Sequence, residues 1–400
     1  MIRSSKLSIK HANKMKNQNI DLFFNEYKSV VLKFIDFLWD KNEIPLLLPK
    51  EITNKIDTWF SKRMIQCAGK QASGIVRGTK QKQKQRLYII NKLTKEHKIK
   101  QAKKLQKIYN ETNISKPKLN NVNPELDSRF IKIDLENKTI FDGWLTISSI
   151  GNKMKLIIPF NRSSHFNKWN KKGKLKQGVR ISNRDITFMF DIPDRKKLDD
   201  GKILGIDIGQ KTVISCSNGF TSQKNNHNHD LSTITNRLKR KKKGSKGFRR
   251  EQEHRKNYIN WTINQLKFKN IRQINIENIK NLRRGRRTNR SLSHWVYATI
   301  FDKLERKCEE QGVLVNHINP IYTSQRCSEC GWTCKSNRNG KLFNCVSCGF
   351  SYDADLNASF NIALNLSEIS RKKRLQQINR KGFYWLIEGQ ESIVPVVQKI

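Results

Sequence analysis

The stretch PIYTSQRCSECGWTCKSNRNGKLFNCVSCGFSYDADLNASFNIA, residues 320–363, joins a four-cysteine pattern to an acidic helix start. Two CxxC elements, each followed by glycine, supply the four cysteines: Cys327, Cys330, Cys345 and Cys348. This spacing predicts a zinc ribbon, in which two turns with left-handed glycines present four thiolates to Zn²⁺. Four sulfur ligands leave no position for water, so the predicted site is structural rather than catalytic.

Disulfide pairing is the alternative interpretation of two CxxC elements. No secretory signal peptide precedes the chain, so we expect an intracellular, reducing compartment, cytoplasmic and nucleoid-associated if the source is prokaryotic. Cys334 is interpreted as a spare thiol on the ribbon turn. The isolated Cys67, Cys216 and Cys308 are interpreted as plain thiols.

An aspartate pair follows the ribbon directly. Asp355 lies where a helix begins, because Phe360, Ala363 and Leu364 follow at helical spacing. Taken alone, Asp355 is interpreted as an N-cap that accepts free backbone N–H groups. Two acids earlier in the chain, Asp207 and Glu277, instead favour a role for Asp355 in a shared carboxylate site.

Two strand-like segments each contain one acid. Asp207 lies in the apolar run ILGIDIG, and Glu277 ends the run IRQINIE. A lone buried carboxylate costs several kcal/mol unless it is paired or metal-bound. The alternative is that each acid lies just beyond its strand in a solvated turn.

Acids on two strands and a third acid on a helix describe an RNase H-like fold. In that fold Asp207, Glu277 and Asp355 would converge to hold two Mg²⁺ ions. One ion activates water, and the other stabilises the leaving oxygen of a phosphodiester. Mn²⁺ is the alternative ion, since both metals accept oxygen ligands.

The composition indicates a polyanionic partner. With 80 Lys and Arg against 34 Asp and Glu, the 400-residue chain has a formal charge of +46. Such an excess repels itself unless nucleic acid is bound. A basic membrane-surface protein is the rival class, but no apolar run approaches about 18 residues, so no membrane partner is expected. The oligomeric state is not predicted.

We predict a multidomain α+β chain. Helical segments are expected around 23–38, near 52–68 and from about 75 to 109, and period-two patterns follow. The expected boundaries are 1–123 for a mainly helical, basic domain, with the first residues assigned here or to the next domain; 124–196 for an antiparallel, β-barrel-like domain; 197–320 for the first part of a nuclease domain; 321–352 for the ribbon; 353–368 for the final nuclease helix; and 369–400 for a tail without a readable motif.

Two basic runs are the candidate nucleic-acid contacts. Either they bind phosphate, or they are solvated helix faces and basic loops. The candidates are Arg237, Lys239, Arg240, Lys241, Lys242, Lys243, Arg249 and Arg250 in the first run, and Arg283, Arg284, Arg286 and Arg287 in the second.

Residues from about 202 to 366 resemble a known family. GIDIG, RLKRKKKGSKGFRR, INIENIKNL, PIYTSQRCSECGW, NCVSCGF and DADLNASFNIA together look like the RuvC-type nuclease of transposon-encoded TnpB proteins and of the compact type V CRISPR effectors descended from them. Before residue 202 the resemblance is weak. There, only length, charge and the helical-then-β order agree with the family's recognition and wedge domains.

The resemblance implies an RNA-guided DNA endonuclease. Its partners would be a guide RNA and a double-stranded and single-stranded DNA target, chosen by pairing and by a short flanking motif. Asp207, Glu277 and Asp355 match the family's acids, with Asp353 as runner-up for the third, and the four cysteines match its ribbon ligands. The family's D-x-N-A-A run here has Ser359 as its last residue.

Two other functions remain open. An unguided RuvC or RNase H-like nuclease or transposase would cut without RNA. A nuclease-dead repressor would bind nucleic acid only, although the presence of all three acids disfavours it.

Overall fold

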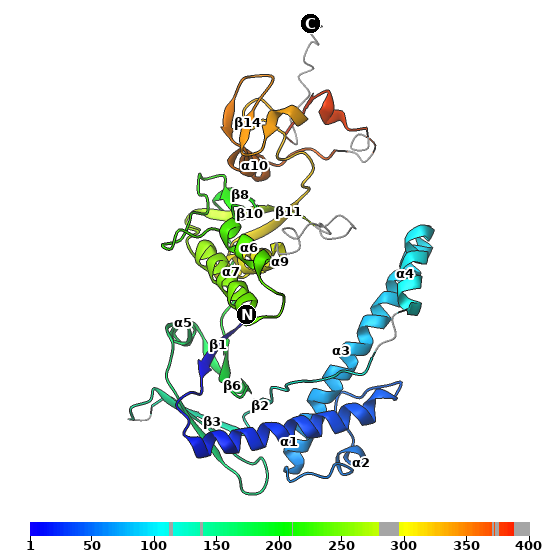
Figure 1. Ribbon diagram of the computed structural model, residues 1–400, viewed down its shortest axis with the longest axis vertical. Helices are drawn as coiled ribbons and strands as arrows, with labels where there is room; N and C mark the ends of the chain where they lie inside the picture. The colour runs from blue at the N-terminus through cyan, green and yellow to red at the C-terminus, as the bar shows by residue number, and fades with distance from the viewer. Residues whose placement is uncertain are drawn as a thin grey trace. The chain divides into compact units, whose positions relative to one another are not determined.

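A computed structural model describes residues 1–111, 115–136, 139–209, 211–279, 296–369, 372 and 376–387. The chain has a multidomain α/β architecture and divides into two compact units, Met1–Pro193 and Asp194–Ile400 (Figure 1). No helix in these described ranges is long and apolar enough to cross a membrane.

The first unit combines long helices with two antiparallel sheets. Its elements are β1 (Ile2–Ser8), α1 (Lys14–Trp39), α2 (Lys50–Thr53), α3 (Lys62–Lys95), α4 (Ile99–Glu111), β2 (Glu125–Asp127), β3 (Ile131–Asp134), β4 (Gly143–Ile147), β5 (Leu156–Phe160), α5 (Ser164–Lys172), β6 (Lys174–Ile181) and β7 (Asp185–Asp191).

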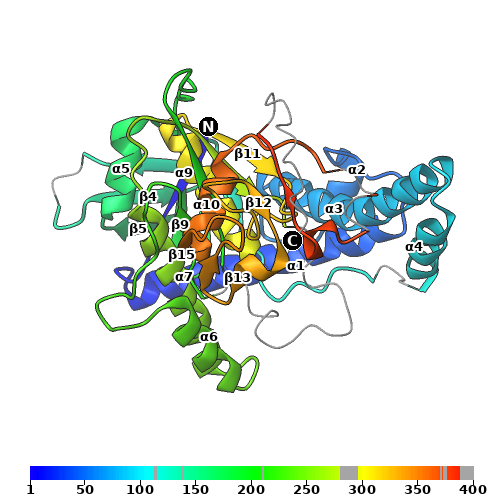
Figure 2. The same ribbon diagram turned by 90° about the horizontal axis from the view of Figure 1, so that it is seen from above.

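The apolar periodicity around residues 23–38 correctly predicts helix α1. Phe23, Tyr27 and Phe34 are fully buried on one face of that helix. The predicted bounds of the next helices are wrong. One continuous helix, α3, begins after the N-cap Ser61 and extends to Lys95, and α4 packs against it (Figure 2).

The predicted β-domain contributes two sheets. One has the strand order β1-β7-β6-β2, so the first residues of the chain pair with strand β7. The other has the order β3-β4-β5. One hydrophobic core runs from Leu7 through α1 and α3 to Ile192, so the helices and both sheets of this unit share their packing.

The second unit contains the candidate site. Its elements are β8 (Lys202–Asp207), β9 (Ser215–Cys216), α6 (Leu231–Arg240), α7 (Lys246–Asn264), β10 (Ile271–Glu277), α9 (Tyr297–Gln311), β11 (Leu314–Ile318), β12 (Trp332–Thr333), η1 (Lys335–Asn337), β13 (Arg338–Asn339), β14 (Leu342–Asn344), β15 (Ser351–Asp353), α10 (Ala354–Ala363), η2 (Ile378–Arg380) and β16 (Phe383–Tyr384).

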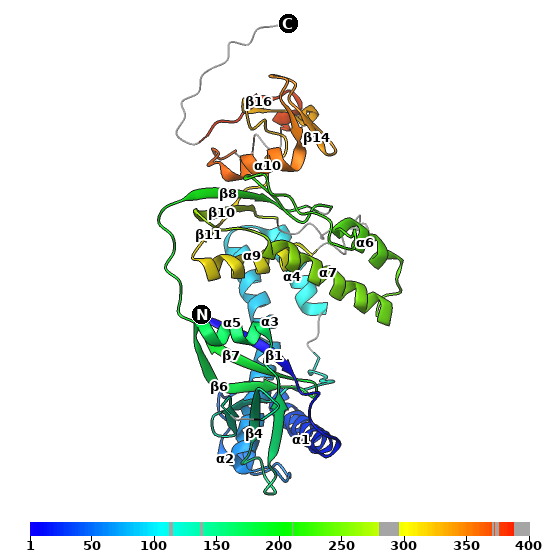
Figure 3. The same cartoon turned by 90° about the vertical axis from the view of Figure 1, so that its left-hand side faces the viewer.

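A four-stranded sheet with the order β11-β10-β8-β9 forms the centre of this unit. Strands β8, β10 and β11 are parallel, and β9 is antiparallel to β8. Helix α10 lies on one face of the sheet, and α7 and α9 lie on the other (Figure 3). The sheet therefore has two covered faces, as parallel strands require.

Gly205 lets helix α10 approach strand β8 closely. A Cβ atom at this position would lie 2.0 Å from the Ser359 backbone oxygen and 2.4 Å from the Ala363 nitrogen. Both obstacles are backbone atoms, so neither can rotate away. The glycine of the GIDIG stretch therefore determines how near the helix comes to the strand that carries Asp207.

Replacing Gly205 by alanine is expected to destabilise the second unit by about 3 kcal/mol or more, because the added methyl forces α10 off the sheet. Thermal unfolding followed by circular dichroism measures the effect. Gly247→Ala is the matched control, since a Cβ there meets only ordinary contacts at 3.6 Å or more. Equal melting temperatures for the two variants would contradict this account of the packing.

The ribbon region is a three-stranded sheet, β13-β14-β15, with a two-stranded sheet, β12-β16, beside it. Strand β16 belongs to the segment predicted to be a tail without a motif. Trp332 pairs with Tyr384, and the Arg326 Nε donates to the Trp385 carbonyl at 2.9 Å. Residues 376–387 therefore pack against the ribbon.

Candidate active site

The acids of β8 and β10 lie on the sheet face that α10 covers. Side chains alternate along a strand, so Asp207 points to the same face as Gly205, which contacts α10. Glu277 shares its face with Asn275, whose amide donates to the α10 carbonyl of Ile362 at 2.9 Å. Since Ile206 pairs with Ile276 in register, the next residues, Asp207 and Glu277, are neighbours across the ladder.

Helix α10 brings Asp355 to this face from its first turn. The N-cap is Asp353, whose Oδ1 accepts the backbone N–H groups of Asp355 and Leu356 at 2.9 and 3.0 Å. The N-cap interpretation of Asp355 is therefore wrong. Asp355 is 7 % exposed, and its carboxylate is left for other partners. Asp353, the runner-up for the third acid, is occupied with capping.

The three acids interact electrostatically. Burial raises the pKa of the Asp207 carboxyl to about 8, with further contributions from the charges of Glu277 and Asp355. The positive charges of Arg338 and Lys341 lower the pKa of Asp207 and so oppose part of this increase. Burial also raises the pKa of Glu277, which is 9 % exposed. The solvated-turn alternative is wrong for Glu277, and Asp207 is at least half-buried among like charges.

A buried hydroxyl orients Glu277. The Thr323 Oγ1 donates a hydrogen bond to Glu277 Oε1, and Thr323 is 1 % exposed. Asn361 of α10 in turn donates to the Thr323 carbonyl at 3.0 Å. The segment before the ribbon therefore connects the second acid to the helix that carries the third.

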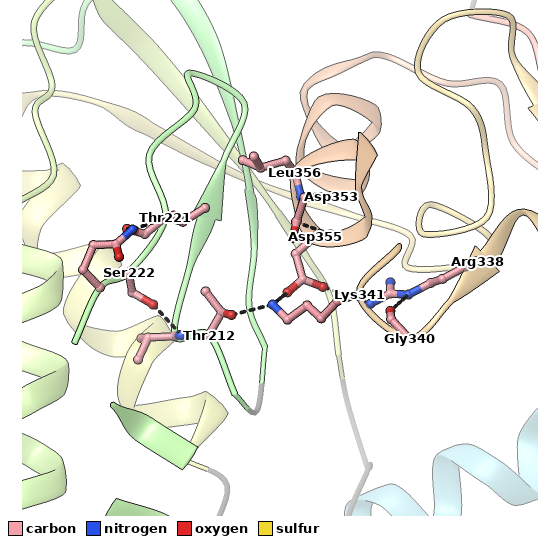
Figure 4. Close-up of polar contacts among 11 residues, drawn as sticks. Thr212, Thr221, Ser222, Arg338, Gly340, Lys341, Asp353, Asp355 and Leu356 are labelled. Carbon is pink, nitrogen blue, oxygen red and sulfur yellow. Dashed lines mark hydrogen bonds and ion pairs between the residues drawn. The ribbon is translucent and has the colours of Figure 1, made fainter. Parts of the chain in front are cut away.

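Two cations of the ribbon hairpin bind the Asp355 carboxylate (Figure 4). The Arg338 Nη2 donates to Oδ1 at 2.9 Å, and the Lys341 Nζ donates to Oδ2. Lys341 also donates to the Thr212 Oγ1 at 2.7 Å, in the loop that follows strand β8. Both oxygens of Asp355 are thus occupied by positive groups.

The asparagines of DADLNASFNIA fix the ribbon to α10. The Asn357 Nδ2 donates to the Arg326 carbonyl at 2.8 Å, and its Oδ1 accepts the Ser328 N–H at 3.0 Å. The Asn361 Oδ1 accepts from Arg326 Nη1 at 2.8 Å. Ser359, the departure from the family's alanine, donates to the Leu356 carbonyl at 2.7 Å, so its buried hydroxyl is satisfied.

Without added divalent metal, the stability of the second unit is expected to fall as the pH rises from about 4 to 8. Over that window folded Asp207 keeps a proton that the unfolded chain loses, because the folded pKa is about 8 and the usual value is 3.8. Asp207→Asn carries no such proton, so its melting temperature should exceed the wild-type value increasingly toward pH 8. Thermal melts across this range measure the difference, and exposed Asp200→Asn is the control. A pH-independent difference would contradict the raised pKa.

The four ribbon cysteines form a compact group. Their sulfur atoms all lie within 4.8 Å of one another, and the Cys327–Cys348 and Cys330–Cys345 pairs are 3.8 and 3.6 Å apart. A tetrahedron with Zn–S bonds of about 2.3 Å has edges of about 3.8 Å. All four are free cysteines, so the disulfide alternative does not hold. The group is compatible with a zinc ribbon.

Both CxxC turns use left-handed glycines, as the pattern predicts. Gly331 has φ +79° and Gly349 has φ +74°. Their N–H groups donate to the carbonyls of Cys327 and Cys345 at 3.0 and 2.9 Å. Cys334 lies outside the sulfur group, and its Sγ contacts the Ser336 hydroxyl at 2.9 Å.

The first basic run lies on α6, on the turn after it and on the start of α7. Arg237, Arg240, Lys242, Lys243, Arg249 and Arg250 are exposed, as is Lys241, and Lys239 is half-buried. The second run, Arg283, Arg284, Arg286 and Arg287, lies outside the described residues. The structure therefore places the first set at the surface of the second unit.

Sequence reasoning missed the residues that contact the acids. Thr323, Arg338 and Lys341 lie within the quoted stretch 320–363, but nothing in their local pattern distinguishes them. The Asn339–Gly340 pair does mark a hairpin turn, and Gly340 has φ +61°. That signal predicts a hairpin turn between Arg338 and Lys341, but not which carboxylate these two cations bind.

The sequence matches known proteins in its C-terminal part. Residues 297–362 match the family model described as Cas12f1-like, TNB domain. Over 83 residues the chain is 46% identical to a CRISPR-associated endodeoxyribonuclease Cas12f1 of Sulfoacidibacillus thermotolerans, which covers 20% of each chain. Over 81 residues it is 33% identical to the TnpB-like protein aq_aa05 of Aquifex aeolicus (strain VF5), which covers 20% of this chain and 26% of the relative.

Solved structures also align over most of the chain. An example is a cryo-EM structure of a Cas12f1-sgRNA-target DNA complex, with a TM-score of 0.44, 16% identity, and coverage of 91% of this chain and 98% of the other. The residues that match the family model include the four ribbon cysteines and Asp355. Residues 297–362 are therefore similar to the TNB domain of Cas12f1-like proteins, and parts of the chain are similar in sequence to Cas12f1 and TnpB-like proteins.

Proposed function

We propose that this protein is a metal-dependent, RNA-guided DNA endonuclease with an RNase H-like (RuvC) nuclease domain. The acid cluster carries the proposal. Asp207, Glu277 and Asp355 come from two strands and a helix, and the pKa of Asp207 is raised first by burial and then by the charges of the other two acids. Grouping like charges in a partly buried site costs stability, which is typical of catalytic and metal sites.

The donor set fits Mg²⁺ or Mn²⁺. Carboxylate oxygens are the hard ligands that these ions prefer, and the three acids offer no sulfur or imidazole. When bound, a pair of such ions supplies an activated water and stabilises the leaving oxygen of the phosphodiester. Asp207, Glu277 and Asp355 would hold them.

The surrounding residues keep the acids in place. Thr323 holds one Glu277 oxygen, and Gly205 allows α10 to bring Asp355 above strand β8. The group of four ribbon cysteines would bind Zn²⁺ as a structural ion, close in sequence to Asp355. In this proposal the ribbon serves as a support for the third acid.

The basic surface of the second unit supports a nucleic-acid substrate. The exposed cations of α6 and the start of α7, Arg237 to Arg250, face solvent within the unit that carries the acids. A strongly basic surface binds phosphate backbones with little sequence preference. Sequence choice would then come from a guide RNA, as the family resemblance implies. The matched Sulfoacidibacillus relative is a CRISPR-associated endodeoxyribonuclease, which agrees with a DNA substrate.

Sequencing the RNA that copurifies with the protein tests guidance. Asp207→Ala protein is expressed with its native flanking DNA, and the bound nucleic acid is sequenced. We expect one discrete RNA with a constant part and a variable end. The sequence of the variable end would identify the DNA target through base pairing. A smear of host RNA, or no RNA, would contradict guidance and favour an unguided nuclease.

A further inference from the structure

Lys341 connects three parts of the acid site through one ammonium group. It lies in the turn between β13 and β14, and its backbone is held because its carbonyl accepts the Ala354 N–H at 2.8 Å. Its Nζ bridges the Asp355 carboxylate and the Thr212 hydroxyl (Figure 4). The side chain therefore spans from the ribbon to the loop after β8.

The ammonium occupies a position that conflicts with bound metal. A divalent ion on Asp355 lies about 2.1 Å from a carboxylate oxygen. The Lys341 Nζ already binds Oδ2, and Arg338 binds Oδ1. Two divalent ions bring four positive charges to three carboxylates, so a further ammonium on the same oxygen would be strongly repelled.

Lys341 can leave this position more easily than Arg338. Its side chain is 49 % exposed, whereas that of Arg338 is 30 % exposed. The Arg338 Nε also donates to the Gly340 carbonyl at 3.2 Å, which anchors the guanidinium. The Lys341 ammonium also gives up its Thr212 hydrogen bond when it moves, but its flexible stem is more exposed, so water can replace both partners.

We propose that Lys341 closes the acid cluster in the metal-free protein and is displaced from Asp355 when a divalent cation binds. The lysine acts as a counter-ion that the metal must replace. This inference rests on the proposed function, because it takes the three acids as the metal ligands. It adds a residue that sets how readily the site takes up metal.

Metal titration of Lys341→Met tests the proposal without a cleavage assay. Methionine keeps most of the stem and removes the charge. Binding of Mn²⁺ to the full-length protein is followed by electron paramagnetic resonance at fixed ionic strength. The variant is expected to bind Mn²⁺ about fivefold more tightly, because metal no longer breaks a partly exposed, charge-assisted hydrogen bond. Unchanged or weaker binding would overturn the proposal.

Lys335→Met controls for general charge effects. Lys335 is an exposed lysine of the same ribbon, so its removal changes the net charge equally. It should leave Mn²⁺ affinity unchanged, and an equal gain in both variants would overturn a specific role for Lys341.

Asp207→Asn separates this inference from the proposed function. If the variant binds Mn²⁺ as tightly as wild type, or wild type binds none, the acid cluster is not the metal site and both ideas fail. If binding needs Asp207 but ignores Lys341, only the lysine proposal fails.

Discussion

Asp207→Ala protein, loaded with its RNA, is expected to cut target DNA about a thousandfold more slowly than wild type, or not at all. Metal ions contribute several kcal/mol of transition-state stabilisation, and each 1.4 kcal/mol corresponds to about a factor of ten in rate. Asp207 ends strand β8, so under the proposed function its loss removes a metal ligand from the site. Single-turnover cleavage of the target named by the guide measures the effect.

Two aspartates provide controls for this experiment. Asp200 is exposed two residues before strand β8, and its replacement by alanine should leave the rate unchanged. Asp353→Ala removes the N-cap of α10 and should cost about 1 kcal/mol of stability. It should slow cleavage far less than Asp355→Ala does. Full activity in Asp207→Ala protein would contradict the catalytic assignment and favour a binding-only protein.

RNA binding should survive the Asp207 change. The substitution removes one negative charge from a strongly basic chain and leaves the cations of α6 and α7 in place. Retained RNA with lost cleavage would place the defect in the chemical step. Loss of both would indicate that the second unit no longer folds, which a thermal melt detects.

The acid cluster could be predicted because it follows from strand periodicity. Side chains alternate along a strand, so the position of an acid at the end of an apolar run determines the sheet face on which it lies. Parallel strands bring such ends together at one edge of the sheet. Strand periodicity also predicts which face of the sheet Gly205 lies on. Its position two residues before Asp207 places both on the face that α10 covers, but only the structure shows the helix backbone at 2.0 Å from a would-be Cβ.

The polar contacts of the acids could not be predicted from local pattern. Lys341 and Thr212 are 129 positions apart, and their hydrogen bond exists because the ribbon hairpin and the loop after β8 meet. The expectation of two separate helices, near 52–68 and from about 75 to 109, was also wrong because of a contact between residues distant in the sequence. Gly69 lies inside that helix where a Cβ would meet Leu48 Cδ1 at 2.6 Å, so the glycine serves close packing.

Cys345→Ser protein is expected to lose its zinc and, with it, most of its cleavage activity, although all three acids remain. A serine hydroxyl is a poor zinc ligand, and three thiolates cannot close a tetrahedral site. Structural zinc contributes on the order of 10 kcal/mol to the folding of small ribbons, so the region around residues 327–348 should unfold. Zinc content by plasma mass spectrometry and hydrogen exchange of the ribbon measure the two effects.

The loss of activity should arise because the acids are no longer held in position, since none of the three acids is removed. The ribbon leads directly into strand β15 and α10, and β15 pairs with β14, whose preceding hairpin supplies the cations on Asp355. Asn357 and Asn361 also bind the segment that holds Thr323 against Glu277. An unfolded ribbon therefore releases the supports of both acids.

Cys334→Ser is the matched control, since Cys334 is a buried ribbon cysteine outside the sulfur group. It should keep about one zinc per chain, as a four-sulfur site predicts, and near wild-type cleavage. If zinc-free Cys345→Ser protein cut at the wild-type rate, the acids would hold their geometry without the ribbon. Asn357 and Asn361 would then have to be reinterpreted as contacts that stabilise the fold without positioning the acids.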